Sequence, residues 1–442
     1  MSDISAPHPG YFTAARQLRL QAALASVIAT GLFAALLISF EPFASNERFA
    51  VEPAGPNPVN QIGFSILCLV AIGGMATFAL RRHVAAIADL GWIVIAACLL
   101  FSASNASDPA GALRSIAFTL FVVITCAGVL ALPHSVSRLG TVLASAILLV
   151  LALSYFGILF LPGLAIHGPG GAEAQHEGLW RGLFPHKNVA GPVVATFLFI
   201  GIYLMRAGHR WTGVLIILLS ALFVIQTGSR TTNGMIPMAI GAVFLGRLTA
   251  TRWTPPLAAI TLVGFAALFT VGASVSTAIF EMIANYISDP TFTGRTSLWA
   301  YGLENIAQRP WAGYGFDNFW LKPVVTDSFL PIDAEWDYRD IVNGHNNYID
   351  LALFMGVPAA ALVILLLCIR PLLDFVRCRP FAENRRLADC FMMILVFVLL
   401  NSMLESSWFR RADPTWVMMV IAVLGLRMTS RLNLRPDANQ SH

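Results

Sequence analysis

Long apolar segments separated by short polar ones dominate the pattern of this chain. A helix needs about 20 mostly apolar residues to cross a bilayer, and twelve segments approach that length. They are 21–40, 61–80, 84–101, 113–132, 141–162, 189–206, 211–227, 231–247, 256–280, 347–368, 388–404 and 415–429. The pattern therefore predicts an all-α, polytopic membrane protein with about 12 transmembrane helices.

Composition agrees with this interpretation. Hydrophobic residues make up 57% of the chain and charged residues only 12%, whereas a soluble domain carries about 25% charged residues. The net charge is +4, and no basic block resembles a nucleic-acid-binding arm. We therefore expect the lipid bilayer as a partner and no nucleic acid.

Basic residues predict the orientation of the helices. With both termini in the cytoplasm, 17 of the 28 basic residues fall on that side, mostly in short connections, where they act most strongly on topology. We expect a cytoplasmic N-terminus, nine membrane helices, a large periplasmic loop, three more helices and a cytoplasmic C-terminus. The corresponding ranges are 1–20, 21–280, 281–346, 347–429 and 430–442.

Segment 281–346 is the largest polar piece, and loops of this length are often functional. Its four tryptophans suggest a cap resting on the membrane interface, where Trp is enriched; they are Trp299, Trp311, Trp320 and Trp336. Within it we expect an amphipathic helix from Thr296 to Gln308, stopped by Pro310.

Two arginines on the outer side stand at expected helix starts. Arg230 lies in Gly228–Thr232, and Arg295 lies at the start of the cap helix. Free backbone amides and the positive end of the helix dipole favour anions there, and a guanidinium binds phosphate through two parallel bonds. The pair predicts a site for a diphosphate; the alternative is that both arginines anchor helices at the interface.

His345 lies at the boundary between the loop and the tenth apolar segment, followed by Asn346 and Tyr348. An imidazole with an ordinary pKa near 6.5 can accept a proton at working pH. Asn346 could orient it or bind sugar hydroxyls, Tyr348 could stack on a sugar ring, and Asp350 could pair with an outer arginine instead of orienting the histidine. The alternative is an interfacial histidine at a helix start, with asparagine as the N-cap.

Arg181, His186, Lys187 and Asn188 crowd into the eight residues before the sixth apolar segment. This group could contact substrate phosphate or an acceptor sugar, or it could be an ordinary basic turn. Asp89 lies within an apolar segment, where an acid is a functional candidate unless it pairs internally. The charged turn from Glu405 to Asp413 is expected to be solvated. Neither cysteines nor carboxylates have metal-ligand spacing, so we expect no metal, cofactor or disulfide.

The ordered set of motifs resembles the O-antigen ligase and Wzy-type polymerase superfamily, most closely its ExoQ-like exopolysaccharide polymerases. The motifs are Trp180–Asn188, Thr227–Thr231, Gly294–Arg295 with Leu298–Trp299, Pro310–Phe316, His345–Tyr348 and Gly356–Pro358.

The resemblance implies an inner-membrane enzyme with a periplasmic active site that uses no metal. It would transfer a glycan from an undecaprenyl diphosphate carrier to an acceptor hydroxyl, with chain-length regulator and export proteins as further partners. His345 matches the catalytic histidine of the family, and Arg230 and Arg295 match its diphosphate-binding arginines.

Four functions remain open from the sequence. A polymerase of exopolysaccharide repeat units is the first, and a ligase that moves glycan onto lipid A core or protein is the second. A transporter or flippase of lipid-linked sugars would place ionisable residues near the middle of several helices, where Asp89 is essentially alone. A structural scaffold leaves the arginines at helix starts unexplained.

Overall fold

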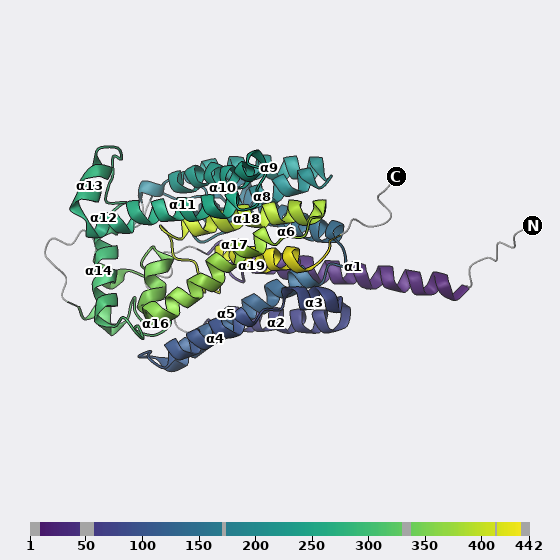
Figure 1. Ribbon diagram of the computed structural model, residues 1–442, viewed down its shortest axis with the longest axis horizontal. Helices are drawn as coiled ribbons and strands as arrows, with labels where there is room; N and C mark the ends of the chain where they lie inside the picture. Colours follow the sequence, from purple (N-terminus) through teal and green to yellow (C-terminus); the bar gives the residue numbers. More distant parts are fainter. Residues whose placement is uncertain (1–8, 45–56, 170–173, 329–336, 412, 435–442) are drawn as a thin grey trace, which may run out of the picture.

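The computed structural model describes residues 9–44, 57–169, 174–328, 337–411 and 413–434. Within these ranges the chain is helical and has no strand; an isolated bridge pairs Ile166 with Trp180. The long helices run lengthwise beside one another as a bundle (Figure 1). The prediction of an all-α polytopic protein is confirmed.

Among the described residues, seven helical segments are long and apolar enough to cross a membrane, or eight if one bent pair counts as a single span. The seven are α1 (Pro9–Ile38), α2 (Pro58–Phe78), α5 (Pro109–Ala131), α6 (Val136–Phe160), α8 (Lys187–Arg206), α11 (Thr254–Phe269) with α12 (Val271–Val275), and α16 (Asn347–Ile364) with η4 (Leu365–Ile369) and α17 (Arg370–Val376). The bent pair, α3 (Arg81–Ile87) and α4 (Leu90–Ala103), meets at 51°.

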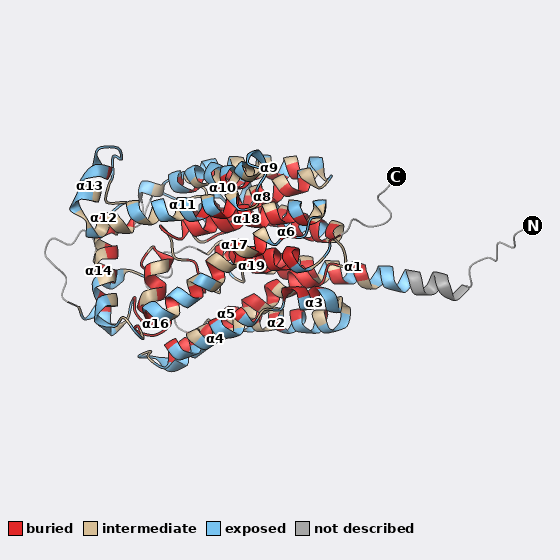
Figure 2. Cartoon of the chain, viewed as in Figure 1, coloured by how far each residue is buried: buried red, intermediate tan, exposed pale blue. Residues whose placement is uncertain are grey.

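Helices also occupy the other four predicted positions: α9 (Arg210–Gln226), α10 (Arg230–Leu248), α18 (Ala382–Asn401) and α19 (Pro414–Arg431). Figure 2 shows α18 and α19 buried along their length in the middle of the bundle. Because neighbouring helices cover them, they need not be as apolar as lipid-facing helices. That these four cross the membrane stays a prediction.

The outside of the bundle is apolar where a water-soluble protein would be polar. Leu69 of α2 is 68% exposed, Ile93 of α4 is 66% exposed and Leu218 of α9 is 63% exposed. Large exposed apolar surfaces mark contacts with other apolar material. These faces therefore fit lipid, and the protein is a multi-pass membrane protein.

One end of the bundle carries a helical cap, and we call it the cap end. Figure 1 shows α13 (Thr277–Ala284) and α14 (Arg295–Gln308) there, with α14 lying across the bundle. The short helices α15 (Pro323–Thr326) and η3 (Tyr338–Asp340) belong to the same segment, and α7 (Pro162–Ala165) and η2 (Ala174–His176) to the loop before α8. The expected cap helix before Pro310 is confirmed.

The cap has its own hydrophobic core. Trp299 and Trp320 are almost fully buried and pack with Phe319 against Ile349 and Leu353 of α16. These two tryptophans therefore fix the cap to the start of α16, and that the cap rests on the membrane interface stays a prediction. Trp311 is 78% exposed, and Trp336 lies outside the described residues.

The opposite end is held by ion pairs. Asp89 caps α4 by accepting a hydrogen bond from the Gly91 amide, and its carboxylate lies 2.6 Å from Arg370 Nη1. Arg427 of α19 pairs with Asp374 at 3.0 Å. Asp89 is therefore internally paired at the bend between α3 and α4, and it does not stand alone in the middle of a helix.

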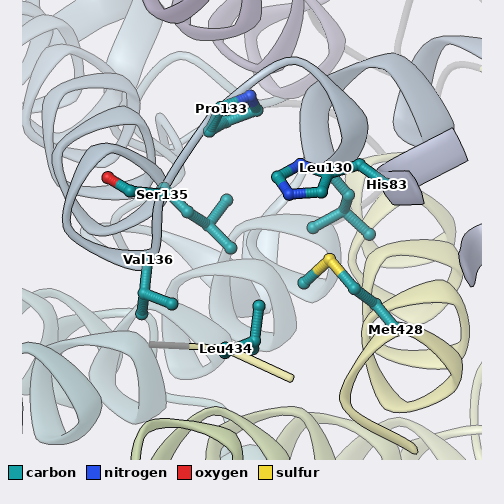
Figure 3. Close-up of a pocket in the computed structure, with 8 residues that line it drawn as sticks. His83, Leu130, Pro133, Ser135, Val136, Met428 and Leu434 are labelled. Atoms are coloured by element: carbon teal, nitrogen blue, oxygen red, sulfur yellow. The ribbon is translucent and has the colours of Figure 1, made fainter. Parts of the chain in front are cut away.

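A small cavity near this end is lined by side chains from α3, α5, α6 and α19 (Figure 3). His83 and Met428 border it, and its volume is about 10 Å³. That volume is about enough for one water molecule, so this cavity is too small for a substrate.

Candidate active site

One carboxylate, that of Glu405, joins three elements at the cap end. Its Oε1 accepts hydrogen bonds from Arg295 Nη2 at 2.8 Å and from Asn188 Nδ2 at 3.3 Å, and its Oε2 lies 3.1 Å from His345 Nδ1. Arg295 Nη2 is also 3.3 Å from the same imidazole nitrogen. We call these four side chains the Glu405 cluster.

The expectation that Glu405 is solvated in an outer turn is wrong. The side chains of Glu405, Arg295 and His345 are only 22%, 14% and 21% exposed. Burial alone would raise the pKa of Glu405, but the positive charge of Arg295 and then His345 outweighs it and lowers the pKa to about 2. Glu405 is therefore ionised at neutral pH.

The ionised Glu405 sets the proton positions on His345. A carboxylate accepts hydrogen bonds only, so the tautomer that makes a hydrogen bond across the 3.1 Å contact is the one with its proton on Nδ1. The other nitrogen, Nε2, then carries a lone pair that can take a proton from a substrate. This arrangement, an acid that orients a histidine base, recurs in enzymes that activate hydroxyl groups.

The backbone around His345 is tightly held. His345 has a φ of 47°, and its amide donates to Asn343 Oδ1 at 3.0 Å. The Gly344 carbonyl accepts from the Trp299 indole at 3.0 Å, and a Cβ at Gly344 would come within 2.5 Å of Asp350. A non-glycine residue in the left-handed region costs free energy, and such residues gather at functional sites.

Asp350 neither orients the histidine nor pairs with an arginine through its own hydrogen bonds. Its Oδ1 accepts from Trp320 Nε1 at 2.8 Å and from the Gly344 amide at 3.1 Å. It therefore joins the cap to the loop before α16 and acts on His345 only through the backbone of Gly344.

Asn346 and Tyr348 attach the start of α16 to the turn after α18. Asn346 is fully buried; its Oδ1 accepts from the Tyr348 and Ile349 amides, and its Nδ2 donates to the Met403 carbonyl. The alternative that asparagine caps this helix is confirmed. Tyr348 donates to the Leu399 carbonyl at 3.1 Å. Their assignment to substrate binding stays a prediction.

Arg295 begins α14 directly after a tight turn. Gly294 has a φ of 79°, and Asp289 accepts hydrogen bonds from the amides of Thr291 and Thr293 in the turn before it. The Nε of Arg295 is buried and has no hydrogen-bond partner among the described residues. Because unpaired buried donors are rare in proteins, this nitrogen is a natural donor for a bound oxyanion.

The start of α8 contributes Asn188 to the cluster. His186 caps this helix by accepting a hydrogen bond from the Asn188 amide at 3.0 Å, and its ring lies 4.9 Å from that of His167 and 5.4 Å from that of His176. Lys187 is buried, with 9% exposed. Asn188 donates a hydrogen bond to Glu405. Roles for His186 and Lys187 in substrate binding stay predictions.

Arg230 is exposed at the start of α10. In the described part of the chain it has no hydrogen bond or ion pair with the Glu405 cluster. Its helix start lies against α8: Ser229 caps α10, and a Cβ built on Gly191 would lie 3.4 Å from Thr232 Oγ1 and 3.5 Å from Ser229 Cβ. Gly191 follows Asn188 by about one helical turn. The structure therefore sets Arg230 on an element beside the cluster.

Arg181 is mostly buried, with 6% exposed. Its Nη1 donates at 3.2 Å to the carbonyls of Ala44 and Pro185. These contacts hold the loop before α8, so substrate contact by Arg181 stays a prediction.

The sequence model of one protein family, described as O-antigen ligase, matches residues 213–364. This match supports the resemblance to the O-antigen ligase and Wzy-type polymerase superfamily. It also supports a membrane enzyme of the ligase or polymerase type that transfers glycans. No curated protein matches the chain.

The ligase-family match runs from α9 to α16 and includes Arg230, Arg295 and His345, but it stops before Glu405 and begins after Asn188. Sequence reasoning missed Glu405 because it is 60 residues from His345 and 110 from Arg295. One signal was available: Glu405 directly follows an apolar segment on the predicted outer side, which also holds both arginines and the histidine.

Proposed function

We propose that this protein is an inner-membrane glycosyltransferase whose active site, the Glu405 cluster, faces the periplasm. It moves a glycan from an undecaprenyl diphosphate donor to a hydroxyl of an acceptor glycan. The observation that carries the proposal is the contact of Arg295 and His345 with one ionised carboxylate beneath the cap.

The proposed reaction is a direct displacement. His345 Nε2 takes the proton of the acceptor hydroxyl. The oxygen of that hydroxyl attacks the anomeric carbon of the donor glycan, and the bond from this carbon to the diphosphate oxygen breaks. The diphosphate leaves with the electron pair. A positioned base typically contributes about 10²- to 10⁴-fold in rate, and a single displacement inverts the anomeric configuration.

The guanidiniums of Arg295 and Arg230 stabilise the charge that develops on the diphosphate. Fixed cations in a site shielded from water are strong stabilisers of such charge. The buried, unpaired Nε of Arg295 supports this role. Since the arginines supply the positive charge, the mechanism requires no metal, and we expect chelation by EDTA to leave the transfer rate unchanged.

Polymerisation of exopolysaccharide repeat units is our first candidate reaction, with chain-length regulator and export proteins as further partners. The description of the matched family favours the second candidate, ligation of a finished glycan to lipid A core or protein. The transporter alternative loses its main residue, because Asp89 is paired at the end of α4.

Deletion of the gene, followed by analysis of carrier lipids and glycans, tests the proposal. If the protein is a polymerase, the deletion strain accumulates single repeat units on the carrier. If it is a ligase, the deletion strain accumulates long chains on the carrier and has none on the acceptor. Unchanged glycans in the deletion strain would exclude both reactions.

A further inference from the structure

A second cavity, which lies at the cap end, has no place in the mechanism above. It measures about 240 Å³ and lies between the loop after α4 and the cap segment that follows α14. Asn105 and Ser107 line it on one side, and Arg309, Tyr314, Asn318 and Lys322 line it on the other. It is a little smaller than the pockets of about 300–1,000 Å³ that hold small-molecule ligands, so it suits a compact group such as one sugar residue.

Among the described residues, the lining of the cavity has two cations and no anion. Neither Arg309 nor Lys322 forms an ion pair with the described residues. The nearby acids have other contacts: Asp108 caps α5 by accepting from the Gly111 amide, and Asp317 accepts from Ser115 at 3.2 Å. Two like charges facing one cavity repel each other, and a bound anion would relieve that repulsion.

A contact with Tyr314 fixes the position of the Arg309 guanidinium. Its guanidinium lies over the ring of Tyr314, 4.7 Å from the ring centre, and the Tyr314 hydroxyl donates to the Asn305 carbonyl at 3.2 Å. Such a cation–π contact keeps the planar group in place, with its donors free for a carboxylate, whose shape matches the guanidinium.

The other side of the cavity offers hydrogen-bond acceptors. Asn105 Nδ2 donates to the Phe101 carbonyl, and the Ser107 hydroxyl donates to Asn318 Oδ1 at 2.8 Å. The carbonyl oxygen of Asn105 and the lone pairs of the Ser107 oxygen can therefore accept from hydroxyl groups. Acceptors opposite two cations fit a ligand that carries both hydroxyls and a carboxylate.

The cavity is connected to the Glu405 cluster through α16. The amides of Tyr314 and Gly315 donate to the carbonyls of Leu353 and Phe354 in α16, at 2.7 and 2.9 Å. Leu353 is six residues into α16, about 9 Å along the axis from the helix start that follows His345. A glycan chain bound here could therefore extend towards the transfer site.

The geometry points to this cavity as a binding subsite for an acidic glycan, in which Arg309 and Lys322 hold a sugar carboxylate and Asn105 and Ser107 accept from sugar hydroxyls. The inference rests on the proposed glycan transfer and names its substrate class. A lipid headgroup would supply the same negative charge, and the binding test below distinguishes the two sources.

Binding of defined oligosaccharides to the purified full-length protein tests the inference. The probes are a hexamer of galacturonic acid and, as the neutral counterpart, maltohexaose. We expect the acidic hexamer to bind about tenfold more tightly, and the Arg309→Gln/Lys322→Gln double variant to lose about tenfold of that affinity, with maltohexaose unaffected and salt weakening the wild-type binding.

Arg339→Gln is the matched control, because Arg339 is another exposed arginine of the cap segment, paired with Asp337; it should bind like the wild type. Arg309→Lys, which keeps the positive charge, should bind the acidic hexamer more tightly than the double variant does. Thermal unfolding of every variant reports whether the cap still folds. Equal binding of the two hexamers, or equal loss in Arg339→Gln, would overturn the subsite. The subsite would also be overturned if the Arg309→Gln/Lys322→Gln double variant lost binding of phosphatidylglycerol but still bound the acidic hexamer as tightly as the wild type.

His345→Ala separates this inference from the proposed function. We expect this variant to bind the acidic hexamer normally while it fails to transfer glycan. Normal transfer by His345→Ala would refute the proposed mechanism whatever the hexamer does, whereas lost transfer with no preference for the acidic hexamer would refute the subsite alone.

Discussion

At the residue scale, the proposed function depends on one carboxylate with three partners. Glu405 accepts from Asn188 and Arg295 and contacts His345, so its charge acts on both the arginine and the imidazole. Sequence spacing could not predict this, since Asn188 is 217 residues away from Glu405. By contrast, His345 and Arg295 were predictable, because each stands at the start of an expected helix on the outer side.

Glu405→Gln keeps the size of the side chain and removes its charge. We expect transfer to slow by about 10²-fold, because the amide no longer fixes the proton on Nδ1 of His345 or balances Arg295. Initial rates in proteoliposomes measure this. Glu304→Gln, on the exposed face of α14, is the control, and a rate for Glu405→Gln as high as that of the control would contradict the assignment.

The lowered pKa of Glu405 also predicts how stability depends on pH. Its pKa falls from 4.5 to about 2 on folding, so its charge stabilises the folded state above pH 4.5, by at most on the order of 3 kcal/mol. That contribution disappears as the pH falls towards 2. The difference in Tm between wild type and Glu405→Gln should therefore narrow below pH 4.5; a constant difference from pH 7 to pH 3 would argue against a charged Glu405.

At the element scale, helix ends place the reactive groups. The starts of α8, α14 and α16 supply Asn188, Arg295 and, one residue before the N-cap, His345. The long apolar runs predicted α8 and α16 well, because each run has the length of a membrane crossing, whereas α14 was predicted from its amphipathic pattern before Pro310. The turn after α18 was poorly predicted, since its contacts depend on how α16 and α18 pack together.

Asn346→Ala tests the cap of α16. It removes the acceptor for two amides and the donor to Met403, so we expect a loss of about 1–2 kcal/mol in stability together with slower transfer, because His345 is the preceding residue. Thermal unfolding and transfer rates measure both effects. Ser276→Ala, which removes the cap of α13, should lower Tm while it leaves transfer intact.

Asp89→Ala tests the other end of the bundle. It removes the cap of α4 and leaves Arg370 without this carboxylate. Removing one partner of a fully buried ion pair typically costs about 3–5 kcal/mol, and this pair is partly exposed, so we expect a smaller loss of stability. We expect a lower Tm but a normal transfer rate for the protein that remains folded. Loss of transfer at an unchanged Tm would mean that Asp89 acts in the function after all.

At the scale of the whole molecule, polar chemistry is concentrated at the cap end. The opposite end holds ion pairs among Asp89, Arg370, Asp374 and Arg427. The basic residues of the sequence predicted which segments share a side, because positive charge disfavours translocation. They could not predict that the cap has its own core around Trp299, which results from packing between distant segments.

The orientation is tested by single cysteines in a cysteine-free background, one at Glu304 in the cap and one at Arg377 at the other end. Both positions are exposed. A membrane-impermeant maleimide should label the first in intact spheroplasts and the second only after lysis. The reverse pattern would place the Glu405 cluster in the cytoplasm.

Transfer by the purified protein tests the central claim most directly. With an undecaprenyl diphosphate glycan and an acceptor glycan in proteoliposomes, His345→Ala should slow transfer by at least about 10²-fold while it binds the donor nearly as well as the wild type. Arg230→Ala and Arg295→Ala should weaken use of the donor. A purified His345→Ala protein that transfers glycan at the wild-type rate would contradict the account.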